Sequence, residues 1–105
     1  MQNKFLLNLG LAHRAGKIIC GTESVRDSIK RRRALLVIVS CDISEKQKKE
    51  ILDSASFYKV EAVCVPYTMS ELSSALGKMS SVACAAITDI GFKTLAKNSL
   101  EHQEV

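Results

Sequence analysis

Residues 16–33, GKIICGTESVRDSIKRRR, hold the densest set of groups in this chain that could bind a ligand. Lys17 follows a glycine turn, and a second glycine turn at Gly21 precedes a helix that Thr22 can cap. Four consecutive cations, residues 30–33, end that helix. Unpaired N–H groups and a positive dipole end attract phosphate to a helix N-terminus, and flanking cations strengthen the field. The segment predicts phosphate binding; the alternative is an ordinary amphipathic helix with a solvated basic face.

The remaining residues offer little for catalysis. There is no GxxxxGKS/T phosphate loop and no GxGxxG after a predicted strand. Asp42 and Asp89 each follow a predicted strand, where α/β enzymes carry carboxylates, but both are more simply caps or turn residues. We expect no enzyme activity and no cofactor, and keep an enzyme using Asp42 or Asp89 as a minor alternative.

Cysteine spacing and apolar content point to a reducing compartment. The four cysteines, Cys20, Cys41, Cys64 and Cys84, lie far apart in or beside apolar runs, so we expect buried, inert thiols and no metal site. The longest apolar run, residues 34–39, is too short for a membrane, and the N-terminal residues lack the order of a signal peptide. The expected location is the cytoplasm.

Charge is unevenly distributed along the 105 residues. Residues 1–33 carry eight Lys and Arg against two acids, whereas the rest carries seven lysines against nine acids. A basic surface on a nearly neutral body suits a polyanionic partner. Aromatic residues are scarce, which argues against an exposed platform for stacking single-stranded bases. Tyr67, in the turn of residues 65–68, is the aromatic placed to approach a nucleotide, with packing on the core edge as the alternative.

Strand and helix patterns alternate along the whole chain. Helices are expected to begin at Asn3, Thr22, Ser44, Thr68 and Asp89, with strands over residues 18–20, 34–39, 61–65 and 82–87. Left-handed glycines should end two helices, at Gly16 and Gly77. The last helix should bury Phe92, Leu95 and Ala96. This order predicts an α/β fold, a three-layer α/β/α sandwich with a small, mostly buried mixed sheet. We expect one domain over residues 1–100, a frayed tail over 101–105, and a monomer.

Several of these motifs resemble one family. The run Leu9-Gly-Leu-Ala-His-Arg-Ala-Gly-Lys17, and later Val65-Pro66, Ala75-Leu-Gly77 and Thr88-Asp-Ile-Gly-Phe92, are similar to the bacterial YlxQ-like ribosomal-protein group. That group is a branch of the kink-turn RNA-binding superfamily, which includes archaeal L7Ae and eukaryotic L30e ribosomal proteins. The resemblance implies the same sandwich and a non-catalytic RNA-binding domain associated with the ribosome or its RNA.

The resemblance also implies an RNA site made by two loops, the turn before the second helix and the turn at Tyr67 and Thr68. Family members read Gly-x-Asn-Glu-x-x-Lys in the first turn. Aligned on Gly21, this chain has Glu23 at the Asn position, Ser24 at the Glu position and Asp27 at the Lys position. Two carboxylates there repel phosphate, which predicts weaker kink-turn recognition.

We therefore expect most of the affinity for RNA to come from Lys17 and the basic helix end. The expected RNA-contacting residues are Lys17, Gly21, Thr22, Glu23, Ser24, Arg26, Lys30, Arg31, Arg33, Tyr67 and Thr68. The partner would be structured RNA, a kink-turn of ribosomal or messenger RNA. The alternative function is an adaptor for proteins of transcription or translation, with weak or absent RNA contact.

Overall fold

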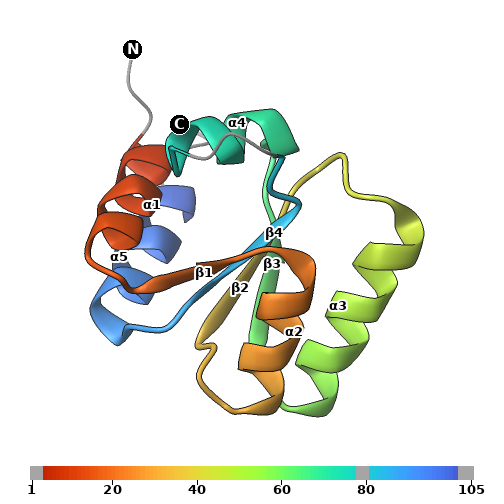
Figure 1. Ribbon diagram of the computed structural model, residues 1–105. Helices are drawn as coiled ribbons and strands as arrows, with labels where there is room; N and C mark the ends of the chain where they lie inside the picture. The colour runs from red at the N-terminus through yellow and green to blue at the C-terminus, as the bar shows by residue number, and fades with distance from the viewer. Residues whose placement is uncertain (1–3, 78–80, 102–105) are drawn as a thin grey trace.

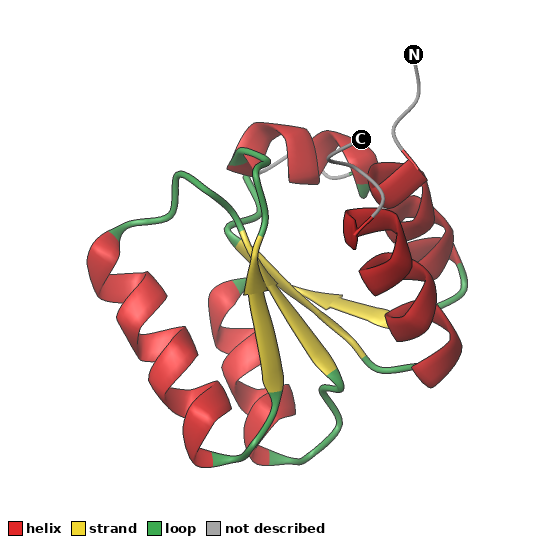
Figure 2. Cartoon of the chain, turned by 180° about the vertical axis from the view of Figure 1, so that it is seen from behind, coloured by secondary structure: helices red, strands yellow, loops and turns green. Residues whose placement is uncertain are grey.

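The computed structural model describes residues 4–77 and 81–101 of the chain and forms the predicted three-layer α/β/α sandwich (Figure 1). The elements are α1 (Lys4–Arg14), β1 (Ile18–Cys20), α2 (Thr22–Lys30), β2 (Leu36–Val39), α3 (Glu45–Phe57), β3 (Glu61–Cys64), α4 (Met69–Ala75), β4 (Cys84–Ile87) and α5 (Ile90–Glu101). Helices α2 and α3 cover one face of the sheet, while α1, α4 and α5 cover the other (Figure 2). None of the described helices is long and apolar enough to cross a membrane.

The sheet is mixed, with the strand order β1-β4-β2-β3. Strands β2 and β3 are parallel, and β4 is antiparallel to both β1 and β2. Every residue of the two central strands, β2 and β4, is buried, because each lies between helices on both faces. The predicted strands are present, with ends that differ by up to two residues.

Strand directions give the sheet two different ends. At the first, the Gly21 N–H donates to the Cys84 carbonyl (3.2 Å), and the Cys41 N–H donates to the Tyr67 carbonyl (2.9 Å). We call this the loop end; it comprises Gly21 with the first turn of α2, residues 22–24, and the loops of residues 40–44, 65–68 and 81–83. At the opposite end, the Leu35 N–H donates to the Ile87 carbonyl (2.8 Å) and the Thr88 N–H to the Lys17 carbonyl (3.0 Å).

Side-chain caps start three of the helices as predicted. The Ser44 hydroxyl accepts from the Gln47 N–H of α3, Thr68 and Glu71 form a capping box on α4, and the Asp89 carboxylate accepts from the Phe92 N–H of α5. Gly16 and Gly77 have the left-handed φ expected of residues that end a helix.

The predicted cap of α2 is wrong. Thr22 is the first helical residue and Gly21 is the N-cap, with φ +98°. The chain turns one residue earlier than expected because the Gly21 N–H is held by β4, and the Thr22 hydroxyl lies 3.9 Å from the Cys84 sulfur. Helix α2 also ends earlier than predicted. Its last residue is Lys30, and Arg32 adopts a left-handed φ of 58°.

Two burial predictions are wrong. Leu95 is 47% exposed, because the buried stripe of α5 follows Phe92 and Ala96, and Leu95 lies to one side of it. Cys41 and Cys64 are exposed, since one lies in the turn after β2 and the other ends the edge strand β3, while Cys84 alone of the four is buried. Glu101 still belongs to α5, and the predicted cap Asn3 and the tail 102–105 lie outside the described residues.

Candidate nucleic-acid interface

The N-terminus of α2 is the most open helix end of the loop end. The Val25 N–H donates to the Gly21 carbonyl at 2.9 Å, and no side chain of the described residues caps the helix. The three preceding N–H groups, those of residues 22–24, have no partner among the described residues. Glu23 and Ser24 are exposed. This helix end presents donors and a positive dipole to solvent, which suits an anionic group such as phosphate.

The turns that follow β2 and precede β4 lie beside the start of α2. Besides the contacts of Gly21 and Cys41, the Ser40 N–H donates to the Ala83 carbonyl (2.9 Å), which places the segment before β4 beside the turn after β2. Asp42 accepts from the Met69 N–H at 2.8 Å and so ties that turn to the start of α4. Asp42 was considered only as a possible enzyme carboxylate, and the sequence did not predict that residues 40–42 and 81–83 lie beside the start of α2. Strands that are neighbours in the sheet but distant in sequence leave no local pattern.

Tyr67 lies at the loop end but its ring belongs to the core. The side chain is 7% exposed and stacks on Phe5, with ring centroids 5.5 Å apart and planes 8° from parallel. A nucleotide at this turn would therefore meet the Tyr67 backbone and Thr68, not the aromatic ring. The Thr68 hydroxyl is already engaged with Glu71.

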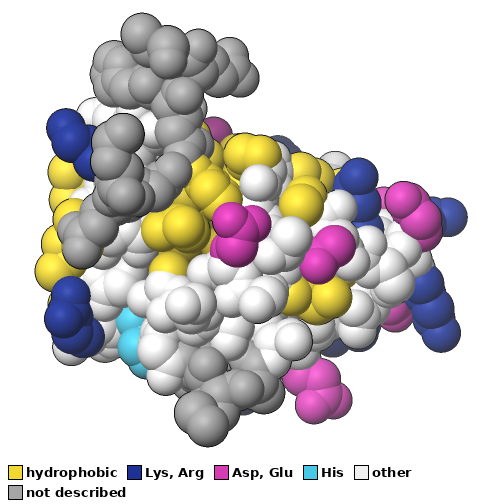
Figure 3. Space-filling model, turned by 90° about the horizontal axis from the view of Figure 1, so that it is seen from above, with side chains coloured by type: hydrophobic (Ala, Val, Ile, Leu, Met, Phe, Trp, Pro, Cys, Tyr) yellow, Lys and Arg dark blue, Asp and Glu magenta, His cyan; other side chains and the backbone are white. Residues whose placement is uncertain are grey.

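The loop end is not a basic surface. Figure 3 looks down on it and shows apolar and acidic side chains in the middle, with Lys and Arg mostly toward two sides. Glu23, Asp42, Glu45 and Glu71 are all exposed acids of the turns and first helical turns at this end. An anionic ligand at this end would meet backbone N–H groups more than cations.

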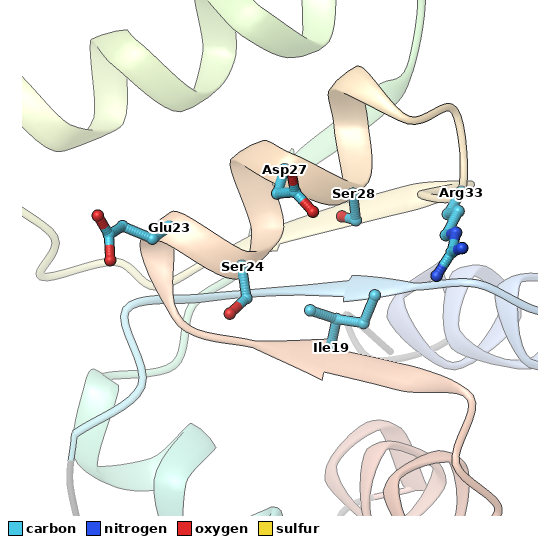
Figure 4. Close-up of a pocket in the computed structure, with 6 residues that line it drawn as sticks. All are labelled: Ile19, Glu23, Ser24, Asp27, Ser28 and Arg33. Carbon is cyan, nitrogen blue, oxygen red and sulfur yellow. The ribbon is translucent and has the colours of Figure 1, made fainter.

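A shallow groove of about 320 Å³ runs between α2 and β1 from the loop end toward the other end of the sheet. Its lining residues are Ile19, Glu23, Ser24, Asp27, Ser28 and Arg33. Figure 4 shows the polar side chains of α2 in a row, with the Arg33 side chain pointing toward the sheet at the far end. The groove thus has carboxylates along the helix and a cation at one end.

The cations predicted to flank the Gly21 turn lie instead at the opposite end of the sheet. We call these cations, Lys17, Lys30, Arg31, Arg32 and Arg33, together with Lys59, which the sequence analysis did not single out, the basic end. The nine residues of α2 span about 13 Å between the two ends. Arg26, midway along α2, is 3.8 Å from Glu50 of α3. The predicted single surface is therefore two surfaces.

Sequence reasoning missed Lys59 and Phe57, both from the end of α3. Lys59 belongs to the basic end because β3 starts beside β2, with Glu61 opposite Leu36. Phe57 is 77% exposed, so an exposed aromatic side chain is present after all. Its position at the end of a helix, outside the apolar stripe of Ile51 and Ala55, was the available signal.

The two carboxylates considered for an enzyme lie far from each other. Asp42 follows β2 at the loop end, whereas Asp89 follows the antiparallel strand β4 at the opposite end. Each accepts a backbone N–H, from Met69 and Phe92 respectively. Among the described residues no three His, Cys, Asp or Glu side chains come together as metal ligands would.

Comparison with known proteins identifies the family. The chain is 36% identical over 93 residues to RNA-binding protein YlxQ of Enterococcus faecium, covering 89% of this chain and 87% of that protein. It is 38% identical over 88 residues to RNA-binding protein YlxQ of Bacillus subtilis (strain 168), covering 80% of this chain and 82% of that protein. A solved structure of a protein with unknown function from Bacillus halodurans C superposes with a TM-score of 0.89 at 29% identity, covering 96% of this chain and all of that one. Residues 3–97 match the model of the ribosomal protein L7Ae/L30e/S12e/Gadd45 family, and the chain is therefore a YlxQ-like member of that family.

Proposed function

We propose that this protein is a non-catalytic RNA-binding protein that holds structured RNA at its loop end. The observation that carries the proposal is the uncapped N-terminus of α2, walled by the turns of residues 40–42, 65–68 and 81–83. Membership of the family and the RNA-binding names of the two relatives support it. The protein would act in the cytoplasm as a monomer, on ribosomal RNA or on a transcript.

Binding would begin with a phosphate or base edge at the first turn of α2. The N–H groups of residues 22–24 donate to phosphate oxygens, and the hydroxyls of Thr22 and Ser24 can donate or accept. Glu23 can only accept, so it suits the amino or imino edge of a base and repels a phosphate. The site therefore recognises a bent or unpaired RNA that offers base edges beside its backbone.

Kink-turn recognition is the finer proposal. The test is binding to a kink-turn RNA and to a plain duplex of equal length over a series of salt concentrations. We expect both to bind with a salt slope and the kinked RNA to bind more tightly. Equal affinities would remove kink-turn recognition while leaving RNA binding, and no binding to either RNA would overturn the proposal.

One N–H group can be deleted to locate the site. Thr22→Pro removes the first N–H of α2 at a position where proline suits a helix. The matched control is Ile90→Pro, at the first position of α5, which lies at the opposite end of the sheet. We expect Thr22→Pro to weaken binding of the kinked RNA severalfold while both variants keep the fold. Equal RNA affinity of the two variants would contradict a contact at α2.

The cysteines provide an independent map. Cys41 and Cys64 are exposed at the loop end, so RNA bound there should slow their alkylation. Burial raises the pKa of the Cys84 thiol, which should stay unreactive with or without RNA and serves as the internal control. Unchanged alkylation of Cys41 and Cys64 in the saturated complex would move the site elsewhere. Association with the ribosome is tested by co-sedimentation with ribosomal subunits.

A second candidate function is an adaptor for another protein. The groove lined by Glu23, Asp27 and Arg33 favours it, because both charge signs face one extended hollow beside the edge strand β1. Pull-down after nuclease treatment separates the two functions. An adaptor keeps its partner, whereas an RNA-binding protein loses it.

A further inference from the structure

We infer that the basic end is a second, separate RNA-binding surface that holds an unpaired strand, so that one molecule bridges two RNA segments. The inference rests on the proposed function, since it assumes that the loop end already holds structured RNA. It concerns Lys30, Arg32, Arg33, Lys59 and the exposed ring of Phe57.

The cations of the basic end are available to a polyanion. All six of its side chains are exposed. Arg31 pairs with Asp27 at 3.0 Å, while the other five form no ion pair with the described residues. Five exposed cations that form no ion pair attract phosphate and release counterions when phosphate binds.

Two cations of the basic end, Arg32 and Lys59, have a backbone conformation that is unusual for residues other than glycine. Arg32 and Lys59 are the two described residues other than glycine with a positive φ, at 58° and 59°. Each ends a helix at a position that glycine usually occupies. At both turns a cation occupies a conformation that costs energy for any residue except glycine. Such backbone outliers suggest that the side chain has a function.

An aromatic platform completes the surface. The Arg32 guanidinium lies 5.9 Å from the centre of the Tyr58 ring, and Phe57 meets Tyr58 edge-on with centroids 4.9 Å apart. These contacts join the turn after α2 to the end of α3 and fix the orientation of the rings. Phe57 is 77% exposed and contacts Tyr58, the ring over which Arg32 lies, so it can offer a face for stacking a base. Cations around an exposed aromatic ring suit single-stranded nucleic acid.

The two surfaces are distinct sites. About 13 Å of helix separates them, and the groove along α2 between them carries the carboxylates Glu23 and Asp27. A phosphate backbone that ran directly from one end to the other would pass these carboxylates. A second RNA segment at the basic end avoids that repulsion.

The test uses a labelled oligouridine strand and a folded kink-turn RNA. We expect both to bind one protein molecule together, seen as a ternary complex by native mass spectrometry. Phe57→Ala should weaken oligouridine binding by about fivefold or more, because a stacked base is lost. The matched control Ile90→Ala removes another exposed apolar side chain, 72% exposed on α5, and should have no effect.

The charge contribution has its own variant. Arg32→Gly with Lys59→Gly removes two cations while suiting the left-handed turns, so the fold is kept. It should lower the salt slope for oligouridine by about one and a half and leave the folded RNA unaffected. Lys46→Gln with Lys49→Gln, an equal charge change on exposed positions of α3, is the control.

Each outcome decides one claim. Displacement of oligouridine by the folded RNA, or a Phe57→Ala variant that behaves like Ile90→Ala, would overturn the second site. If the folded RNA binds and oligouridine does not, the second site is refuted and the proposed function stands. If neither RNA binds, both are refuted. Binding of the basic end to anionic phosphatidylserine vesicles, with no effect of the variants on RNA, would assign the surface to a membrane and overturn the inference.

Discussion

Arg32 and Lys59 have a conformation that an L-residue adopts at a cost of about 1 kcal/mol, each in the turn that ends a helix. Lys59→Gly should therefore raise the free energy of unfolding by about 0.5–1 kcal/mol. Arg32→Gly should leave it nearly unchanged, because the contact with Tyr58, about 0.5–1 kcal/mol for an exposed pair, is lost at the same time.

Denaturant unfolding measures the free energy of unfolding of both variants. Arg33→Gly is the control, since Arg33 does not have a positive φ and glycine only adds freedom to the unfolded chain. Its stability should fall. A Lys59→Gly variant less stable than the wild type would show that the left-handed turn carries no strain for lysine to relieve.

Glu23 is the residue at which the loop end departs most from a phosphate site. It stands exposed in the first turn of α2, among unpaired N–H groups. Glu23→Gln removes the repulsion and should tighten binding of a plain duplex by up to about fivefold, the size of one exposed charge interaction. Asp53→Asn, an exposed acid on α3, controls for net charge. If the two variants gain equally in filter-binding or fluorescence titration, Glu23 does not face the RNA.

At the scale of elements, helix α1 approaches α4 through a glycine. A Cβ on Gly10 would lie 2.9 Å from the Ala75 carbonyl oxygen. Alanine usually stabilises a helix interior by about 1 kcal/mol over glycine, but here it must push two backbones apart. We expect Gly10→Ala to lower the free energy of unfolding by about 1–2 kcal/mol.

Asn98→Ala, at an exposed position in α5, tests the ordinary helix gain and should raise stability by a few tenths of a kcal/mol. The Gly10 variant should also weaken RNA binding, because α4 carries the Thr68 turn of the loop end at its N-terminus. A Gly10→Ala variant as stable as Asn98→Ala would mean that the two helices separate without cost.

Glu61 connects β3 to α5 across one face of the sheet. Its carboxylate lies 2.8 Å from the Lys97 amine and 3.7 Å from that of Lys93. The hydrogen bond from Lys97, with the charges of both lysines, lowers the pKa of Glu61 below its ordinary 4.5. Because the folded pKa is the lower one, the stabilisation is present above pH 4.5 and is lost as the pH falls through the folded pKa.

The expected result is a difference between wild type and Glu61→Gln that is present at pH 6 and vanishes under acidic conditions. The pair is partly exposed, so the difference should be small, about 0.2–1 kcal/mol. Glu50→Gln, whose carboxylate reaches Arg26 only at 3.8 Å, is the control in urea unfolding at each pH. A Glu61→Gln difference that persisted at low pH would show that it does not come from the charged pair.

At the scale of the whole molecule, local signals predicted the architecture well. The capping residues Ser44 and Thr68, the left-handed glycines and the buried run of β2 act over a few residues, so their patterns are legible in one sequence. The three-layer sandwich follows from the alternation of these elements.

The arrangement of the candidate site could be predicted only in part. The Gly21 turn was found, but Lys17 and residues 30–33 were expected beside it and lie at the other end of the sheet. Residues 30–33 are separated from Gly21 by the length of α2. Lys17 precedes β1, whose antiparallel pairing with β4 places Ile18 opposite Ile87, at the other end of the sheet from Gly21. Long-range pairing also brought Lys59 and residues 81–83 to their places, and no local pattern encodes it.

Two surfaces at opposite ends of one small molecule predict a characteristic dependence on protein concentration. With a donor-labelled kink-turn RNA and an acceptor-labelled oligouridine, energy transfer should rise until protein and RNA are equimolar and then fall. Excess protein occupies the two RNAs separately, so fewer molecules hold both. Added salt should abolish the transfer before it releases the folded RNA, because the basic end depends more on cations than the loop end does. The Arg32→Gly, Lys59→Gly variant should give little transfer at any ratio. A signal that rose steadily with excess protein would indicate association of protein molecules with one another, and bridging by a single chain would be wrong.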